Sequence, residues 1–205
     1  LGSSWYYVWP LVVAFFMLVP IAIVFLATLS LTVAIANQSS LLTAALLSPV
    51  IYLLCGFGLC LVLILCKWIV IGEQKPHTIA KLWSSYYCRT NYVRLLQFFC
   101  IPLFLDFIAG SALYNMLFRF LGANIGKGAI ILSTDVTDHD LLRVGDGAVI
   151  EERAIIHPMW YMDERLKTDI VTISGDSILR ENCVVLGGGK ATEGREYPCS
   201  ALIMT

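Results

Sequence analysis

The chain has 205 residues, of which 58% are hydrophobic and only 14% charged, whereas soluble domains are about 45–50% apolar and about 25% charged. Its 14 Lys/Arg nearly balance 15 Asp/Glu, and none of these charges lies between residues 1 and 66. A net charge of −1 without a long basic run argues against a nucleic-acid-binding protein, which needs clustered cations for phosphate contacts. Collagen-like, disordered and disulfide-framework classes are excluded as well, because Gly, Pro and Cys are few and scattered.

The uncharged first third predicts two membrane-spanning helices, at about residues 5–35 and 41–70. A bilayer core of roughly 30 Å needs about 20 apolar helical residues, and both segments are long enough. The polar cluster at residues 37–40 predicts a tight connection, so the two spans form a helical hairpin. A secretory signal peptide is the alternative for the first segment, but that segment lacks a basic start and is too long for an h-region.

Flanking cations predict the orientation of this multi-pass integral membrane protein. Lys67, Lys75, Lys81 and Arg89 follow the second span closely, whereas the N-terminal flank and the hairpin connection carry no Lys or Arg. By the positive-inside rule, the C-terminal part faces the cytosol, or the stroma or matrix of an organelle.

The segment at residues 73–121 is aromatic and mildly basic. Its uncharged runs are broken by Pro102, Asp106 and Gly110, and each is too short to cross a bilayer. We therefore expect interfacial amphipathic helices that lie on the membrane. Asp106 is expected to be an ordinary interfacial residue, the alternative being a functional carboxylate within the membrane.

From residue 122 to residue 205, short aliphatic side chains recur with a period of six. They are Ile125 and Ile131, then Val144, Ile150 and Ile156, then Ile173, Leu179 and Val185. Three such hexads form one triangular coil of about 18 residues, with the aliphatic side chains pointing inward and small residues or Gly at the corners. This pattern predicts an all-β left-handed parallel β-helix built of hexapeptide repeats, which we expect to be truncated at its C-terminus.

One step in this pattern is longer than a coil. From Val144 to Ile173 is 29 residues, which exceeds the coil length of about 18. The surplus predicts a loop that leaves one corner within residues 157–169. The chain is thus divided into a membrane hairpin (1–72), interfacial helices (73–121) and the β-helix (122–205).

Several motifs, taken in order, resemble a known family. They are Lys67-Trp68-Ile69-Val70-Ile71-Gly72, Leu82-Trp83-Ser84-Ser85-Tyr86-Tyr87, residues 110–119 followed by Leu121-Gly122-Ala123-Asn124-Ile125-Gly126, Thr134-Asp135-Val136-Thr137, and His157 with Asp163-Glu164-Arg165. Together they are similar to the membrane-bound C-terminal module of nonribosomal-peptide-synthetase-like proteins of the polylysine-synthetase type. The resemblance covers about residues 67–205. It implies an acyltransferase-like activity in which β-helix units join aminoacyl groups, supplied in that family by adenylation and carrier domains.

Acyl transfer to an amine or hydroxyl needs a base that accepts the proton of the attacking group. His157 closes a coil at the edge of the predicted loop, where hexapeptide-repeat enzymes commonly keep a catalytic histidine, and we predict that it is the general base. Glu164 and Arg165, with Asp163, are candidates to orient the imidazole or to bind a carrier. The alternatives are a structural histidine at a corner and solvated loop charges.

The stretch from Thr134 to Asp140 holds three acids and a histidine in seven residues. A zinc site is not expected there, because only His77, His139 and His157 exist in the chain and zinc sites of related β-helices use three histidines. We expect instead a polar edge of the coil, with Asp and Thr side chains capping turn amides. No metal and no directly bound cofactor is predicted, although an acyl substrate carried on phosphopantetheine is compatible with the family.

The sequence therefore predicts a membrane-anchored acyltransferase-like module for aminoacyl or peptidyl transfer. Its main alternative is a non-catalytic integral scaffold subunit of a large membrane complex, and a carbonic-anhydrase-like enzyme is a third. The expected partners are membrane lipids and a carrier domain or a larger membrane assembly, without nucleic acid. Trimers or tandem β-helix units are both compatible with the repeats.

Overall fold

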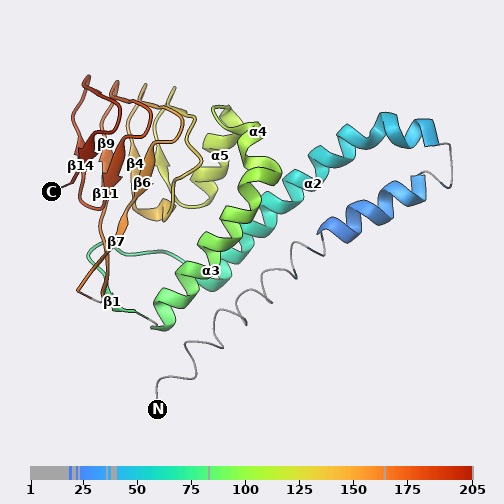
Figure 1. Cartoon of the computed structure of the whole chain (residues 1–205), viewed down its shortest axis with the longest axis horizontal. Coiled ribbons are helices and arrows are strands. Elements are labelled where there is room, and N and C mark those ends of the chain that lie inside the picture. Colours follow the sequence, from blue (N-terminus) through green and yellow to red (C-terminus); the bar gives the residue numbers. More distant parts are fainter. Residues whose placement is uncertain are drawn as a thin grey trace, which may run out of the picture.

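A computed structural model describes residues 19, 22, 24–35, 37, 41–82, 84–163 and 165–204. Helices form one side of this structure and stacked strands form the other (Figure 1). The helices α2 to α5 precede most of the strands in the chain.

Helix α2 (Leu41–Val70) has the bounds predicted for the second span. The described part of the first predicted span is helical and apolar at residues 24–35, and the rest of that span lies largely outside the described residues. Two helical stretches in the described part of the chain have the length and composition of membrane spans, Ala45–Val70 and Ser85–Ile108.

The second of these stretches differs from the broken interfacial helices that the sequence predicted. Helix α3 (Ser85–Cys100) continues through the π-helical turn η1 (Ile101–Leu105) into α4 (Asp106–Ile108). Pro102 lacks an N–H group and its ring crowds the preceding turn, so the chain widens to a π-helical turn at this point and the helix continues. An interfacial position for this segment stays a prediction.

Helix α5 (Ala112–Phe120) lies between the helical side and the strands, and the Ser111 side chain caps its first turn by accepting from Tyr114 N. Its side chains donate hydrogen bonds to main-chain oxygens in and beside the first two parallel strands: Tyr114 Oη to Ser133 O (3.0 Å), Asn115 Nδ2 to Ala129 O (2.6 Å) and Arg119 Nη2 to Ile125 O (2.9 Å). Helix α5 therefore covers the first edge of the strand stack, which would otherwise present unpaired backbone groups.

Three parallel sheets follow, with the strand orders β12-β9-β4-β2, β13-β10-β5-β3 and β14-β11-β6. The chain passes from the first sheet to the second and third and then returns to the first. The strands are β2 (Asn124–Ile125), β3 (Ile130–Ile131), β4 (Leu142–Val144), β5 (Val149–Ile150), β6 (Ile155–His157), β9 (Val171–Ile173), β10 (Ile178–Leu179), β11 (Val184–Leu186), β12 (Lys190–Ala191), β13 (Glu196–Tyr197) and β14 (Leu202–Ile203); the 3-10 turn η2 (His139–Leu141) precedes β4.

The aliphatic residues that recur every six positions are buried, as the sequence predicted. None of these eight side chains is more than 6% exposed, and all belong to one hydrophobic core. The strand register aligns them in columns, for example Ile125 beside Val144 beside Ile173. Burial of these columns is the main apolar stabilisation of the strand region.

The predicted loop within residues 157–169 is a β-hairpin. Strands β7 (Met159–Met162) and β8 (Arg165–Thr168) are antiparallel, and β1 (Ile79–Lys81) adds to β8, so that the sheet order is β1-β8-β7. The excursion therefore pairs with the segment that connects α2 to α3. A sequence period cannot predict this pairing, because it joins residues more than 80 positions apart.

Close packing of α2 on the π-helical turn yields a testable prediction. A Cβ atom on Gly56 would overlap the ring of the buried Phe104, whereas one on Gly58 would meet nothing within 4 Å. We expect Gly56→Ala to lower the free energy of unfolding by about 1–3 kcal/mol through overpacking. The matched variant Gly58→Ala should be neutral or slightly stabilising, because alanine favours helix. Thermal unfolding in detergent measures both, and equal effects would contradict the packing.

Candidate functional site

His157 and Asp135 form a side-chain pair on the outside of the strand stack. His157 is the last residue of β6. The residue before it, Ile156, forms a parallel β-bridge with Val136, which follows Asp135. Ile156 N donates to Asp135 O (3.0 Å), and Thr137 N donates to Ile156 O (3.2 Å). These backbone bonds hold the two segments side by side, and His157 Nε2 lies 3.0 Å from Asp135 Oδ1.

The electrostatics of this pair favour one tautomer of the imidazole. The hydrogen bond from His157 lowers the pKa of Asp135; burial opposes this, and the charges of His157 and Arg94 add to it. The carboxylate is thus ionised at neutral pH and holds the proton on Nε2, which leaves Nδ1 with a free lone pair. The His157 side chain is 33% exposed, so a substrate can reach it.

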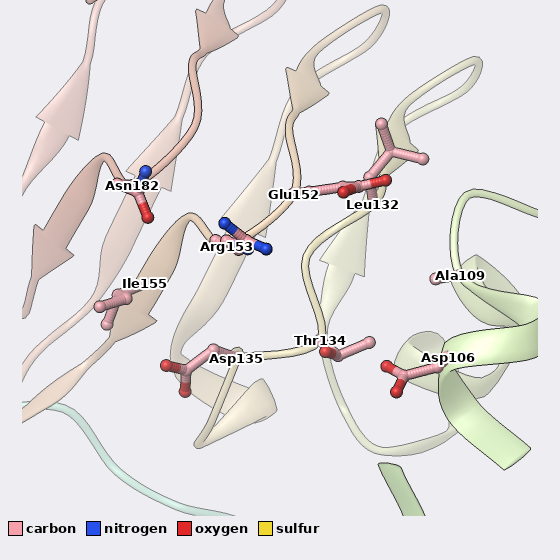
Figure 2. Close-up of a pocket in the computed structure, with 9 residues that line it drawn as sticks. All are labelled: Asp106, Ala109, Leu132, Thr134, Asp135, Glu152, Arg153, Ile155 and Asn182. Atoms are coloured by element: carbon pink, nitrogen blue, oxygen red, sulfur yellow. The ribbon is translucent and has the colours of Figure 1, made fainter. Parts of the chain in front are cut away.

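Asp135 also lines a polar cavity of about 550 Å³ between the helical part and a corner of the strand stack. Figure 2 shows the lining residues, with Asp106 at the start of α4 facing Thr134. The full lining comprises Asp106, Ala109, Leu132, Thr134, Asp135, Glu152, Arg153, Ile155 and Asn182. Asp106, which the sequence analysis treated as interfacial, is therefore a wall of this cavity.

Two residues of the cavity adopt a backbone conformation that is uncommon for side chains other than glycine. Arg153 has φ 57° and Asn182 has φ 56°, and they occupy equivalent corners of successive turns. Ser200, at the equivalent corner of the next turn and outside the cavity lining, has φ 62°, so this conformation belongs to the turn geometry. The lining holds the carboxyl groups of Asp106, Asp135 and Glu152 against one guanidinium, so its net charge is negative.

The other predicted site residues are placed differently from His157. Arg165 begins β8 and pairs with Lys81 and Met162 at the far end of the hairpin. Asp163 lies in the hairpin turn, and Glu164 lies outside the described residues. The structure does not bring Arg165 to His157; the charged residue beside the imidazole is Asp135. The family motif at 134–137 contained Asp135, but nothing in the motif pointed to a partnership with His157.

The sequence predicts that Asp and Thr side chains between Thr134 and Asp140 cap turn amides. In the structure, two of these aspartates form ion pairs instead. Asp140 Oδ1 accepts from Lys67 Nζ at 2.7 Å, and both side chains are 5% exposed. Asp138 Oδ2 accepts from Arg94 Nη2 at 2.7 Å. Gln74 completes the network by donating its backbone N–H to Asp140 (3.0 Å) and its side-chain amide to Asp138 (3.1 Å). Only this backbone bond to Asp140 resembles the predicted amide capping.

These ion pairs join the two long helices to one turn of the strand region. Lys67 belongs to the last turn of α2, and Arg94 to the middle of α3. Gly122, with φ +107°, makes room for the first pair, because a Cβ atom there would overlap Asp140 Oδ1. Three of these four charged side chains are 2–5% exposed and lie within hydrogen-bond distance of an opposite charge, so we assign the pairs a structural role.

His139 lies between the two paired aspartates and is buried edge-on against the Phe118 ring, at 4.5 Å between centroids. Burial lowers the pKa of His139 to about 4; the charge of Asp138 opposes this and that of Lys67 adds to it. Its Nε2 has no hydrogen-bond partner within the described part of the chain. Among the described residues, no three His, Cys, Asp or Glu side chains converge as they would around a metal ion.

The structure thus defines a chain with apolar helices and a region of parallel strands, which carries a His–Asp pair beside a polar cavity. No protein-family profile matches the chain, and no solved structure is significantly similar to it. It is 27% identical over 135 residues, or 65% of its length, to the delta-poly-L-ornithine synthetase of Acinetobacter baumannii (strain AB307-0294). The chain spans about a tenth of the length of that relative. This similarity is consistent with the polyamino-acid-synthetase type that the motifs suggested.

The Lys67–Asp140 pair can be tested by neutralising one partner or both. Lys67→Met leaves Asp140 buried and unpaired, and we expect it to lower the free energy of unfolding by about 3–5 kcal/mol. The double variant Lys67→Met/Asp140→Asn removes both charges and keeps an acceptor for Gln74 N, so it should recover much of this loss. Thermal unfolding in detergent distinguishes the variants. A double variant as unstable as Lys67→Met alone would contradict this account.

His139 should make stability depend on pH. The unfolded chain binds a proton at this histidine near pH 6.5, whereas the folded chain does so only near pH 4. The free energy of unfolding should therefore fall as the pH drops from about 6.5 toward 4, by up to about 3 kcal/mol. His139→Gln should flatten this slope, while His157→Ala should leave it in place. Melting temperatures measured from pH 7 to pH 4.5 give the slopes, and an unchanged slope in His139→Gln would refute the assignment.

Proposed function

We propose that the chain is a membrane-anchored, acyltransferase-like module of a peptide-synthetase-like protein, which transfers an aminoacyl or peptidyl group with His157 as general base. One observation carries this proposal: His157 Nε2 lies 3.0 Å from Asp135 Oδ1, and Asp135 also lines the polar cavity. The similarity to a polyornithine synthetase supports a role related to peptide synthetases.

The pair suits amide formation from a thioester. An acceptor amine attacks the thioester carbonyl while Nδ1 of His157 takes the proton from the attacking nitrogen. The carbon–sulfur bond then breaks, and the leaving thiolate receives that proton from the imidazolium. Asp135 acts as the positioning residue, because its carboxylate fixes the tautomer and stabilises the imidazolium that forms. The thioester is expected to be carried on phosphopantetheine by a carrier domain, and it is a substrate of this reaction.

The charge of the cavity indicates the kind of acceptor. Three carboxyl groups against Arg153 favour a substrate that bears a positive charge in addition to its reacting amine. A diamino acid or a chain that ends in one has this chemistry. The relative's name refers to a polymer of ornithine, which is such an amino acid.

The proposed function includes a more specific fold and placement. We take the three parallel sheets as the faces of a left-handed β-helix of hexapeptide repeats, supported by the return of the chain to each sheet in turn and by the aligned aliphatic columns. The hairpin of residues 5–35 and 41–70 is the proposed anchor. Lys67, Lys75, Lys81 and Arg89 support a cytosolic, or stromal or matrix, position for the β-helix. Trimers or tandem units are compatible with this arrangement.

A non-catalytic scaffold subunit is the second candidate. The observation that favours it is the pair of buried ion bridges, Lys67–Asp140 and Arg94–Asp138, which fix the helices rigidly to the strand region. A scaffold needs that rigidity but has no use for an accessible histidine beside a carboxylate, such as His157 beside Asp135. Activity of variants at this pair therefore separates the two candidates.

The test measures aminoacyl transfer from a carrier thioester by the intact protein. His157→Ala should lower kcat by about 10²-fold or more, which is the usual contribution of a general base. Asp135→Asn should lower kcat with little change in KM, because the imidazolium that forms during transfer loses its carboxylate partner.

The matched control is His77→Ala, which removes a largely exposed histidine (79%) and should leave the rate unchanged. A correctly folded His157→Ala variant with an unaltered rate would refute the catalytic assignment and favour the scaffold.

A further inference from the structure

The three-stranded sheet β1-β8-β7 carries a cationic outer face, formed by Ile79, Lys81, Trp160, Met162, Arg165 and Lys167. Side chains alternate between the two faces of a strand, and cross-strand partners share a face. The register places Lys81 beside Arg165, and Lys167 beside both Ile79 and Trp160. The opposite face holds Leu166, which is fully buried.

The cations of this outer face form no ion pair with a carboxylate in the described part of the chain. Lys81 lies directly opposite Arg165, an arrangement of like charges that destabilises a sheet. No described carboxylate forms an ion pair with Lys81, Arg165 or Lys167, and the Lys167 ammonium lies 3.4 Å from the sulfur of Met162. The face is therefore complementary to an anionic surface outside the chain.

The position of this cationic outer face in the chain points to a membrane as its anionic partner. Strand β1 lies between the end of α2 at Val70 and the start of α3 at Ser85, and both helices belong to stretches with the composition of membrane spans. Figure 1 shows β1 and β7 close to the start of α3. Cations within a few residues of a span lie within reach of lipid headgroups.

The uncharged residues of the face fit the same surface. Ile79 is 60% exposed and Met162 is 51% exposed, whereas the ring of Trp160 packs against Gly187 of the strand region. Exposed apolar side chains beside Lys and Arg suit the membrane–water interface, where apolar and charged groups both find favourable surroundings.

We propose that the cationic outer face docks on anionic phospholipid headgroups of the leaflet at which α2 ends and α3 begins. This rests on insertion of α2 in a bilayer and is independent of the catalytic role of His157. Pro158 alone separates His157 from β7, so docking of the hairpin would hold the His157–Asp135 pair close to the membrane surface.

The experiment uses the chain in two kinds of nanodisc, one of phosphatidylcholine alone and one that also contains about 30% phosphatidylglycerol. This content gives a surface potential comparable to that of anionic membranes. A membrane-impermeant amine reagent modifies exposed lysines, and mass spectrometry reads each site. We expect modification of Lys81 and Lys167 to fall about fivefold in the anionic discs and to recover in about 0.5 M salt, where charges are screened within a few ångströms. The exposed Lys127 and Lys190 of the strand region are internal controls and should not change.

A second arm uses charge-matched variants and separates lipid from free phosphate. Lys81→Gln/Arg165→Gln/Lys167→Gln should abolish preferential retention of phosphatidylglycerol in native mass spectrometry, whereas Lys127→Gln/Arg143→Gln/Lys190→Gln should keep it. Equal modification of Lys81 and Lys167 in both kinds of nanodisc would overturn the proposal. Equal protection by inorganic phosphate in phosphatidylcholine discs would also overturn it, because the face would then bind anions without a bilayer.

Discussion

Two buried ion pairs fix the helical part of this chain to its strand region. Taking a charge out of water costs several kcal/mol, and that cost is offset only when a partner is held in good geometry. Lys67 on α2 and Arg94 on α3 meet Asp140 and Asp138, which are two residues apart on one turn. Sliding either helix would leave a buried charge unpaired. These pairs therefore restrict sliding of the helices, in addition to close apolar packing such as that of Gly56 against Phe104.

The cavity depends on this joint. One of its walls is Asp106 at the end of the α3 helical stretch, and another is the corner that holds Thr134 and Asp135. These walls belong to different parts of the fold, and the ion pairs and the α5 hydrogen bonds keep them at a fixed separation. A cavity lined by two separate elements keeps its shape only when those elements are held at a fixed separation.

The sequence predicts the local structure of this chain better than its long-range pairings. The period of six identifies the buried aliphatic columns, because every sixth side chain enters the same core and must be apolar. Val136 follows Ile131 by five residues and therefore falls outside the period of six. The repeat thus could not predict that Asp135 lies beside His157. Lys67 and Asp140 are 73 residues apart, and the hairpin pairs with β1 across more than 80 positions. Contacts of this kind depend on how complete elements pack, which no short motif records.

The stretch from Asp135 to Asp140 shows why residue type alone could not locate the site. Its aspartates are chemically identical, yet Asp138 and Asp140 are buried against cations, whereas the Asp135 side chain is 52% exposed beside an imidazole. Loss of one partner of a buried ion pair would leave the other charge uncompensated, so such a pair serves the structure. A half-exposed pair remains open to solvent and to other molecules. The difference in solvent contact therefore separates the two aspartates that hold the joint from Asp135, which stays accessible beside His157.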